Sequence, residues 1–295
     1  MKILFDFKHI CLVILLCICI ISCTEKPVDP DINDGSTVVL NDTILLNESY
    51  GSHTRQVFDI HLPAERGSTT SVILMIHGGG WKEGQKEDFN SYVQLIKSKW
   101  KTVAVVTMNY RLASNTNNIH HPEIMADINS VVNYLNTNKS KYHISNNIGV
   151  VGASAGSHLA MIYAYSYNSN IKCVGNIFGP AILNDWTWYN SFNIVSGVKT
   201  GDIISEYVGR TWDTTSYKAA SPYWNVTSST QPTIIFHGNL DPIVPVYHSQ
   251  WLFGKLKDLG VPTQYHEYIA FHSFDNNQSD DVIEKLVTFF KVYLK

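Results

Sequence analysis

Short apolar runs alternate with longer stretches of helical periodicity along most of the chain. The runs predict strands at residues 38–46, 56–62, 71–77, 102–109, 147–152, 171–178, 233–237 and 263–269. Helical patterns fall at residues 88–100, 122–136, 155–165, 246–259 and 280–293. The first two strands suit an antiparallel pair. The later ones are continuous apolar runs separated by helices, which predicts an α/β fold with a mostly parallel central sheet and helices on both faces.

The N-terminal segment has the pattern of an export signal. Lys2 and Lys8 precede an apolar run at residues 10–21, which is shorter than the roughly 20 residues of a membrane-spanning helix. The run ends at Ser22 and Cys23, which resembles the lipoprotein box of bacteria. We therefore predict a lipoprotein signal peptide at residues 1–22 and lipid on Cys23. That lipid would hold the protein at a membrane of the bacterial cell envelope, facing the periplasm or the outer surface. An ordinary secretory signal or an uncleaved anchor is the alternative, and without lipid a cleaved protein would be secreted.

Residues 23–36 differ in composition from the rest of the chain. They contain Pro27, Pro30, Gly35 and four acidic residues, with few apolar ones, which indicates a flexible tether. No repeat or second linker follows, so residues 37–295 are predicted to form one domain.

The composition narrows the class of protein. The chain is 44% hydrophobic and 16% charged, which excludes an intrinsically disordered protein. Lys and Arg total 22 against 25 for Asp and Glu, a balance that gives no general attraction for phosphate backbones, so we expect no nucleic-acid partner. Cys173 is the one cysteine after Cys23, which rules out a disulfide framework within the domain.

The strongest chemical signal is a candidate nucleophile after the strand predicted at 147–152. Residues 152–156 read Gly-Ala-Ser-Ala-Gly, which matches G-x-S-x-G between an apolar strand and a helix. Ser154 would occupy a tight turn with its hydroxyl exposed. Side chains at positions 152 and 156 would crowd the neighbouring backbone. This context favours a catalytic serine over a structural turn.

A serine nucleophile needs a base, and the base needs an orienting carboxylate. Asp241 follows the strand at 233–237, and His272 follows the strand at 263–269. Both residues therefore fall at the same sheet edge as Ser154. Asp241 before Pro242 could instead begin a turn, and His272 could be a surface histidine. His266 is the competing base, but it lies inside a predicted strand.

The attacked carbonyl oxygen becomes negatively charged and needs N–H groups aimed at it. The glycine run 78–80 follows a buried strand and would let backbone amides approach a substrate. We therefore predict an oxyanion hole from the N–H groups of Gly79, Gly80 and Ala155. His77 is expected to brace this loop rather than transfer protons.

These motifs resemble the α/β-hydrolase carboxylesterases. The shared segments, in order, are residues 77–81 (HGGGW), 109–112 (NYRL), 122–135 with Asp127, 152–156 (GASAG), 217–222 (YKAASP) and 237–245 (HGNLDPIVP), followed by His272. The chain is similar in particular to bacterial secreted acetyl-xylan and feruloyl-type esterases and to hormone-sensitive-lipase-like esterases. The resemblance implies the α/β-hydrolase fold, with Ser154 as nucleophile, His272 as general base and acid, and Asp241 as its orienter. It also implies structural roles for Tyr110, Arg111 and Asp127.

The predicted function is a serine carboxylesterase that hydrolyses short-chain or aryl esters through an acyl-enzyme, with glycan esters as a candidate substrate class. The alternative is a serine amidase or peptidase on the same fold, including an arylformamidase-like activity. A non-catalytic surface glycan-binding protein is a distant third, because Ser154, Asp241 and His272 are all present. No zinc, paired-cysteine, phosphate-loop or dinucleotide motif occurs, so we expect no metal and no cofactor.

Residues 179–223 are predicted to form a small irregular cap insertion. Seven aromatic residues in this stretch are candidates for the substrate site: Trp186, Trp188, Tyr189, Phe192, Tyr207, Trp212 and Tyr217. Their rings could line the substrate site and hold a sugar or an aryl acid, or they could pack the cap on its own. The stretch is too polar for the wide apolar lid of a long-chain lipase.

Overall fold

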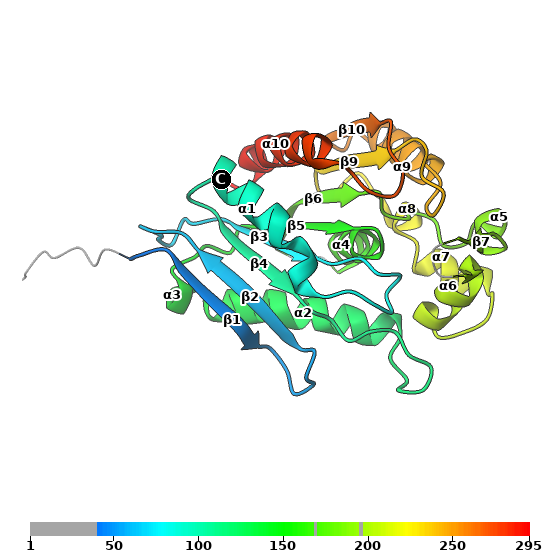
Figure 1. Ribbon diagram of the computed structural model, residues 1–295, viewed down its shortest axis with the longest axis horizontal. Helices are drawn as coiled ribbons and strands as arrows, with labels where there is room; N and C mark the ends of the chain where they lie inside the picture. The colour runs from blue at the N-terminus through cyan, green and yellow to red at the C-terminus, as the bar shows by residue number, and fades with distance from the viewer. Residues whose placement is uncertain (1–39, 168–169, 195–196) are drawn as a thin grey trace, which may run out of the picture. The chain divides into compact units, whose positions relative to one another are not determined.

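An eight-stranded sheet forms the centre of the computed structural model, which describes residues 40–167, 170–194 and 197–295 (Figure 1). Its strand order is β1-β2-β4-β3-β5-β6-β9-β10. The strands are β1 (Thr43–Ser49), β2 (Val57–Leu62), β3 (Val72–Ile76), β4 (Ala104–Met108), β5 (Ile148–Ala153), β6 (Ile171–Ile177), β9 (Thr233–Gly238) and β10 (Thr263–Tyr268). The β1–β2 and β2–β4 pairs are antiparallel, and all other neighbours are parallel. The α/β-hydrolase fold class and the antiparallel opening pair are confirmed.

The N-terminal predictions fall outside the described residues. This applies to the signal peptide at 1–22, to Cys23 and to the tether at 23–36. In the part of the chain that the structure describes, no helix has both the length and the apolar character to cross a membrane.

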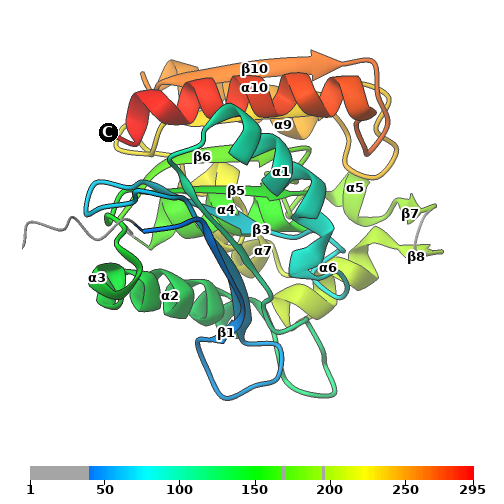
Figure 2. The same cartoon turned by 60° about the vertical axis from the view of Figure 1, so that its left-hand side comes forward.

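Helices cover both faces of the sheet. Alternate residues of β3 belong to two separate hydrophobic clusters, with Ile73 and Met75 in one and Leu74 in the other, because successive strand side chains point to opposite faces. Helices α1 (Asn90–Lys99) and α10 (Asn276–Tyr293) pack on the first cluster. Helices α2 (His121–Thr137), α4 (Ala155–Ser166) and α9 (Tyr247–Asp258) pack on the second (Figure 2).

The local sequence explains where α10 begins and which face it buries. Asp275 accepts a hydrogen bond from the N–H of Gln278 at 2.8 Å, and the Gln278 side chain accepts one from the N–H of Asp275 at 3.1 Å. This capping box satisfies two donors that the first turn leaves unpaired. The buried residues Val282, Ile283, Leu286, Val287, Phe289 and Phe290 recur at helical spacing, so one face of α10 lies against the sheet.

The first strand ends later than predicted. It reaches Ser49, beyond the expected end at residue 46, because its register against β2 shifts between Leu45 and Glu48. Asn47 lies in this bulge with φ of 56°, and its N–H donates to Asp59 at 2.7 Å. A bulge breaks the alternation of apolar positions from which the strand was predicted.

The cap insertion between β6 and β9 is more regular than predicted. It contains a two-stranded ribbon, β7 (Phe192–Asn193) and β8 (Val198–Lys199), and the helices α5 (Trp186–Tyr189), α6 (Thr200–Val208), α7 (Thr214–Ala219) and α8 (Pro222–Asn225). Helix α6 buries Ile204 and Tyr207. It ends at Gly209, whose φ of 81° suits glycine. Helices this short are marginal in isolation, so packing rather than local pattern stabilises them.

Candidate active site

Ser154 lies at the turn between β5 and α4. Its backbone has φ of 54° and ψ of −123°, a region that non-glycine residues rarely occupy and that is found at strained functional turns. The N–H of Ser154 donates to the carbonyl of Ile177 on β6 at 2.9 Å. This sharp strand-to-helix turn is the geometry of a nucleophile elbow.

The two glycines around Ser154 allow segments of backbone to approach closely. A Cβ atom on Gly152 would lie 2.2 Å from the carbonyl carbon of Gly156, and one on Gly156 would lie 1.9 Å from the carbonyl oxygen of Ile76 on β3. No larger residue fits at either position without moving the backbone. The expectation that side chains at 152 and 156 would crowd their neighbours is confirmed.

The structure brings the side chains of Ser154, His272 and Asp241 together. The Ser154 hydroxyl lies 2.8 Å from Nε2 of His272, and Nδ1 of His272 lies 2.5 Å from Oδ2 of Asp241. Asp241 is in the turn after β9 and His272 is in the loop after β10. With the Nδ1 proton donated to the carboxylate, Nε2 is free to accept the proton of Ser154. The competing base, His266, stacks on Phe236 and does not line the site.

Asp241 is held as a carboxylate by several donors. Its Oδ1 accepts the N–H groups of Ile243 at 2.8 Å and Val244 at 3.0 Å. Its side chain is fully buried. Burial alone would raise the pKa of Asp241, but the hydrogen bonds from His237, His272 and Val244 outweigh it and lower that pKa well below its usual range. Asp241 therefore stays negative beside the imidazole.

His237 is a site residue that the sequence analysis did not single out. Its Nε2 lies 2.9 Å from the carbonyl of Val244 and 3.3 Å from Oδ2 of Asp241, and its Nδ1 lies 2.6 Å from the hydroxyl of Ser249. The proton is therefore on Nε2, because a carbonyl can only accept. The signals in the sequence were the position of His237 near the end of a strand, four residues before Asp241, and its place at the start of the shared segment 237–245.

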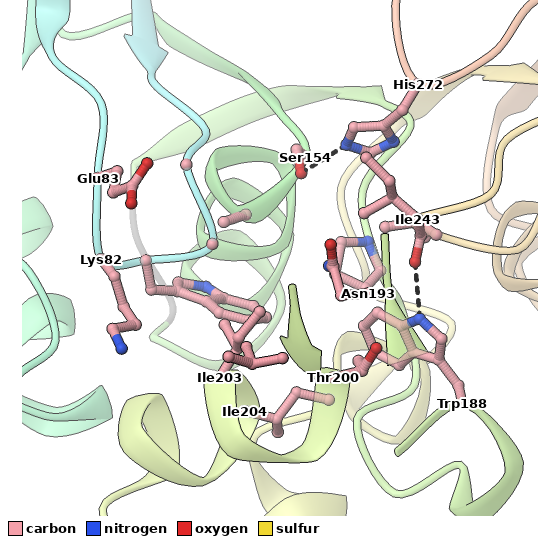
Figure 3. Close-up of a pocket in the computed structure, with 17 residues that line it drawn as sticks. Lys82, Glu83, Ser154, Trp188, Asn193, Thr200, Ile203, Ile204, Ile243 and His272 are labelled. Carbon is pink, nitrogen blue, oxygen red and sulfur yellow. Dashed lines mark hydrogen bonds between the residues drawn. The ribbon is translucent and has the colours of Figure 1, made fainter. Parts of the chain in front are cut away.

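The predicted oxyanion donors border the same space. Gly79 and Gly80 have φ of 100° and 56°, and both line a cavity together with Ser154 and Ala155 (Figure 3). Within the described residues, the N–H groups of Gly79, Gly80 and Ala155 donate to no backbone carbonyl outside a helix or strand and to no side chain. These donors are open to a ligand beside the Ser154 hydroxyl.

His77 braces the glycine loop from behind. Its ring stacks on Tyr110 at 4.3 Å, its Nδ1 lies 2.8 Å from the carbonyl of Gly78, and its Nε2 accepts from the guanidinium of Arg55 at 3.2 Å. Burial lowers the pKa of His77 to about 4, so it is neutral near pH 7. Arg55 also donates to the carbonyl of Gly84, which closes the loop.

Arg111 and Asp127 form an ion pair away from the cavity. The guanidinium of Arg111 donates to Asp127 at 2.7 Å through Nη2 and at 3.0 Å through Nε. Asp127 also accepts the N–H of Arg111 at 2.8 Å and the side-chain amide of Gln56 at 2.8 Å. The pair fastens the segment after β4 to helix α2, and neither residue lines the cavity.

The cavity beside Ser154 has a volume of about 540 Å³ and a mainly aliphatic far wall. Helix α6 contributes Ile203 and Ile204, and the turn after β9 contributes Ile243 and Val244. Trp188 closes one side, with its indole N–H donating to the carbonyl of Ile243 at 2.8 Å (Figure 3). The remaining lining residues are Trp81, Lys82, Glu83, Pro180, Asn193, Val198, Thr200 and His272.

Most of the predicted aromatic rings do not line this cavity. Of the seven, only Trp188 does. Trp186, Tyr189, Trp212 and Tyr217 pack against one another with ring centroids 4.8 to 5.7 Å apart. These rings thus pack α5 against α7 and the segment before it, although Trp186 remains 58% exposed. Trp81, from the glycine loop, lines the cavity instead.

No group of three or more His, Cys, Asp or Glu side chains in the described part of the chain is arranged to hold a metal ion. Cys173 is buried in β6, and burial raises its thiol pKa. It is therefore an unreactive core residue.

Comparison with known proteins gives one family and several distant relatives. Residues 58–256 match the family described as BD-FAE. The chain is 24% identical over 222 residues to Esterase LipQ of Mycobacterium tuberculosis, covering 71% of this chain and 51% of that protein. It is 32% identical over 112 residues to a kynurenine formamidase of Meyerozyma guilliermondii, covering 38% of this chain and 39% of that protein. The chain therefore spans about half, or less, of the length of these curated relatives.

Among solved structures, the fold is similar to one described as a truncated form of carbohydrate esterase from gut microbiota. The TM-score is 0.72 at 20% identity, and the match covers 86% of this chain and 97% of the other. At 20% identity, this similarity supports the assignment of the fold alone.

Proposed function

The chain belongs to the BD-FAE family, and on that premise we propose that it is a carboxylic ester hydrolase that uses Ser154 as its nucleophile. The observation that carries the proposal is the hydrogen-bonded series from Ser154 through His272 to Asp241, at a cavity bordered by the N–H groups of the glycine loop. The esterase relative supports the same reaction class.

In the first half-reaction, the ester carbonyl lies between the Ser154 hydroxyl and the N–H groups of Gly79, Gly80 and Ala155. His272 takes the hydroxyl proton at Nε2 as the serine oxygen bonds to the carbonyl carbon. The negative charge that develops on the carbonyl oxygen is stabilised by the three N–H groups. His272 then gives the proton to the leaving alcohol oxygen, and the acyl group remains on Ser154.

In the second half-reaction, water is the nucleophile and the Ser154 oxygen is the leaving group. Water enters where the alcohol left, His272 removes one of its protons, and the water oxygen attacks the acyl carbon. The proton returns to Ser154 and the carboxylic acid leaves. Asp241 remains ionised throughout and stabilises the imidazolium that forms twice in each cycle.

The test uses p-nitrophenyl acetate with the wild-type chain and Ser154→Ala. Loss of the nucleophile is expected to lower kcat on the order of 10⁶-fold, with an unchanged melting temperature. Ser130→Ala, an exposed helix serine, is the matched control and should retain full activity. Labelling of Ser154 by a fluorophosphonate, located by peptide mass spectrometry, tests the covalent step directly. A wild-type chain that hydrolyses the ester no faster than Ser154→Ala would refute the proposal.

An amidase of the arylformamidase type is the second candidate, and the kynurenine formamidase relative favours it. The same acyl-enzyme mechanism cleaves a formyl anilide if His272 protonates the leaving nitrogen. The two candidates are separated by kcat/KM for N-formylkynurenine against p-nitrophenyl acetate. A larger value for the formamide would assign the chain to the amidases.

The finer substrate proposal is an acyl group carried by a glycan. Support comes from the similarity in fold to a protein described as a carbohydrate esterase and from a cavity whose volume fits a small acyl group. The test compares acetate release from acetylated xylan with hydrolysis of p-nitrophenyl acetate. Comparable rates on the two substrates would remove the support for a glycan preference.

We also propose that Cys23 is lipidated and places the enzyme at the cell envelope. The support is the Ser22-Cys23 junction after an apolar run. When the chain is expressed in bacteria with its full N-terminus, it is expected to partition into the detergent phase of Triton X-114. Mass spectrometry is expected to detect a lipid-modified N-terminus in the wild-type chain and none in Cys23→Ser. An unmodified Cys23 in the wild-type chain would contradict this proposal.

A further inference from the structure

A strip of exposed and half-buried aromatic and lysine side chains runs from the cap along α9 to α8. Tyr247, Trp251 and Lys255 follow one another at four-residue intervals on α9, which places them on one face of the helix. Lys255 reaches the rings of α8, and Lys218 on α7 lies over the same indole, that of Trp224. We name these five residues, Tyr247, Trp251, Lys255, Trp224 and Lys218, the aromatic–lysine strip.

Side-chain contacts join Tyr247 to Trp251 at one end of the strip, and Lys255 and Lys218 to Trp224 at the other. The rings of Tyr247 and Trp251 are 4.6 Å apart. The Lys255 ammonium is 5.2 Å from the Trp224 ring centroid, and the Lys218 ammonium is 4.2 Å from it. Trp251 is 52% exposed and Trp224 is 43% exposed, so two indole rings present large surfaces to solvent. Helices α8 and α9 both pack on the second hydrophobic cluster, through Tyr223 and Leu252.

Polar contacts hold the rings of the strip in place. The hydroxyl of Tyr247 donates to Oδ2 of Asp185 at 2.5 Å, and the indole N–H of Trp224 donates to Oδ1 of Asn184 at 2.8 Å. Lys255 donates to the carbonyl of Tyr223 at 2.6 Å. Exposed rings that are fixed in this way offer a surface with little conformational entropy to lose on binding.

The two ammonium groups of the strip are not neutralised by neighbouring acids. Neither Lys218 nor Lys255 forms an ion pair with any acid among residues 40–167, 170–194 and 197–295. Burial, and then the charge of Lys218, lower the pKa of Lys255. Two cations next to exposed indoles are a site for an anion attached to a ring with an apolar face.

The cap end of the strip meets the active site. Asp185, which accepts from Tyr247, also accepts the N–H groups of Thr187 and Trp188 and so caps α5. His248, the residue after Tyr247, packs on Trp188 with ring centroids 4.6 Å apart. Trp188 lines the cavity beside Ser154. The cap end of the strip is therefore linked to the wall of the cavity through the buried ring of His248.

From this geometry we infer that the aromatic–lysine strip binds an acidic polysaccharide, with sugar faces on the indole rings and uronate carboxylates at Lys218 and Lys255. The inference rests on the proposed esterase function, to which it adds an acidic glycan as the polymer that carries the ester. The C–H faces of sugar rings pack on aromatic rings, and the ammonium groups select for carboxylates. A bilayer of phosphatidylglycerol also presents anions, but its headgroups offer no sugar ring to pack on the indoles.

The experiment measures binding in the Ser154→Ala background, so that it does not depend on turnover. The probes are glucuronoxylan, the same polymer with its carboxyl groups reduced, and vesicles of phosphatidylglycerol and phosphatidylcholine. Affinity electrophoresis is expected to show retardation by glucuronoxylan and at least fivefold weaker retardation after carboxyl reduction. Trp251→Ala should weaken binding to both polymers at least fivefold, whereas Lys218→Gln should weaken binding to the acidic polymer alone.

Lys291→Gln is the matched control, because Lys291 makes the same kind of contact with Trp100 on another face. It should bind like the parent, and all variants should keep the parent melting temperature. Equal retardation of the parent and both strip variants, or binding to the vesicles without binding to the polymer, would overturn the inference. Hydrolysis of p-nitrophenyl acetate by the wild-type chain is measured separately. Failure of the esterase proposal and failure of the glycan-binding inference can therefore be told apart.

Discussion

Asp241 is the residue on which the charge distribution of the site depends. Two backbone N–H groups occupy its Oδ1, and His272 and His237 approach its Oδ2 at 2.5 and 3.3 Å. A neutral amide in its place would keep the volume, but it would not stabilise the imidazolium of the transition state.

For Asp241→Asn we therefore expect kcat for p-nitrophenyl acetate to fall about 10⁴-fold with little change in KM. Steady-state kinetics measure this. The low folded-state pKa of Asp241 also means that its contribution to stability is present above its unfolded pKa of about 3.9 and is lost as the pH falls below that value. The melting temperature of the wild-type chain should thus fall more steeply below pH 4 than that of Asp241→Asn. Equal slopes would contradict the assignment of Asp241 as an ion.

Glycines in this chain differ in how much space surrounds the Cβ atom that an alanine would add. At Gly156 the added Cβ would lie 1.9 Å from the carbonyl oxygen of Ile76, whereas at Gly254 on α9 no atom lies within 4 Å. We expect Gly156→Ala to destabilise the fold by about 3 kcal/mol or more. Gly254→Ala should stabilise it by about 0.5 to 1 kcal/mol, because alanine is the better helix former. Urea unfolding measures both, and a tolerated Gly156→Ala would show that the elbow can relax.

At the scale of elements, the glycine loop after β3 is fastened to the cap and to α4 through Trp81. The Trp81 ring stacks on Tyr207 of α6 at 4.5 Å, and its indole N–H donates to Nδ1 of His158 on α4 at 3.3 Å. His158 in turn lies 2.8 Å from the carbonyl of Ala220. Trp81 has φ of 62°, a conformation that its packing must maintain.

Removal of this ring should therefore disturb the proposed oxyanion donors next to it. We expect Trp81→Ala to lower kcat for p-nitrophenyl acetate about 10²-fold, since small displacements of positioned groups cost that much. Trp81→Phe keeps the ring on Tyr207 and loses only the bond to His158, so a smaller loss is expected. If both variants lost the same activity, the bond to His158 and not the stacking would position the loop.

The elements differ in how far the sequence predicts them. Strands β3 to β6 and the turn at Ser154 follow from local pattern, because a buried parallel strand is a continuous apolar run and the elbow needs small residues at fixed positions. The sites of Asp241 and His272 follow from the shared edge of parallel strands. Helix α6 and the packing of the cap rings do not, because they depend on contacts with residues distant in sequence. His237 was missed for the same reason, since its partner Ser249 lies on another element.

At the scale of the whole molecule, several histidines are buried as neutral rings. Burial lowers the pKa of His77 and His121 to about 4, and that of His158 and His248 to about 3. In the unfolded chain each would titrate near 6.5. The four rings belong to the glycine loop, α2, α4 and α9, so the effect is spread through the domain.

The sign of the resulting pH dependence follows from these values. Well above pH 6.5, neither the folded nor the unfolded chain binds protons at these four rings, and their contribution to stability is complete. As the pH falls toward 4, the unfolded chain gains protons that the folded chain cannot take up, so the free energy of unfolding decreases. Burial also lowers the pKa of His61 and His266, which adds to the effect in the same direction.

We therefore expect these four rings to take up about four protons from the solvent when the protein unfolds at pH 5. At pH 8 they should take up almost none. Calorimetric unfolding in buffers of different ionisation enthalpy measures the uptake. The pH range in which the histidines lower the free energy of unfolding differs from that of Asp241, whose contribution is lost only below about pH 4. The two contributions can therefore be separated along one pH series. An uptake near zero at pH 5 would mean that the buried rings are protonated in the folded protein. The hydrogen bonds of His77 and His158, in which one ring nitrogen accepts from Arg55 or Trp81, could not then form as described.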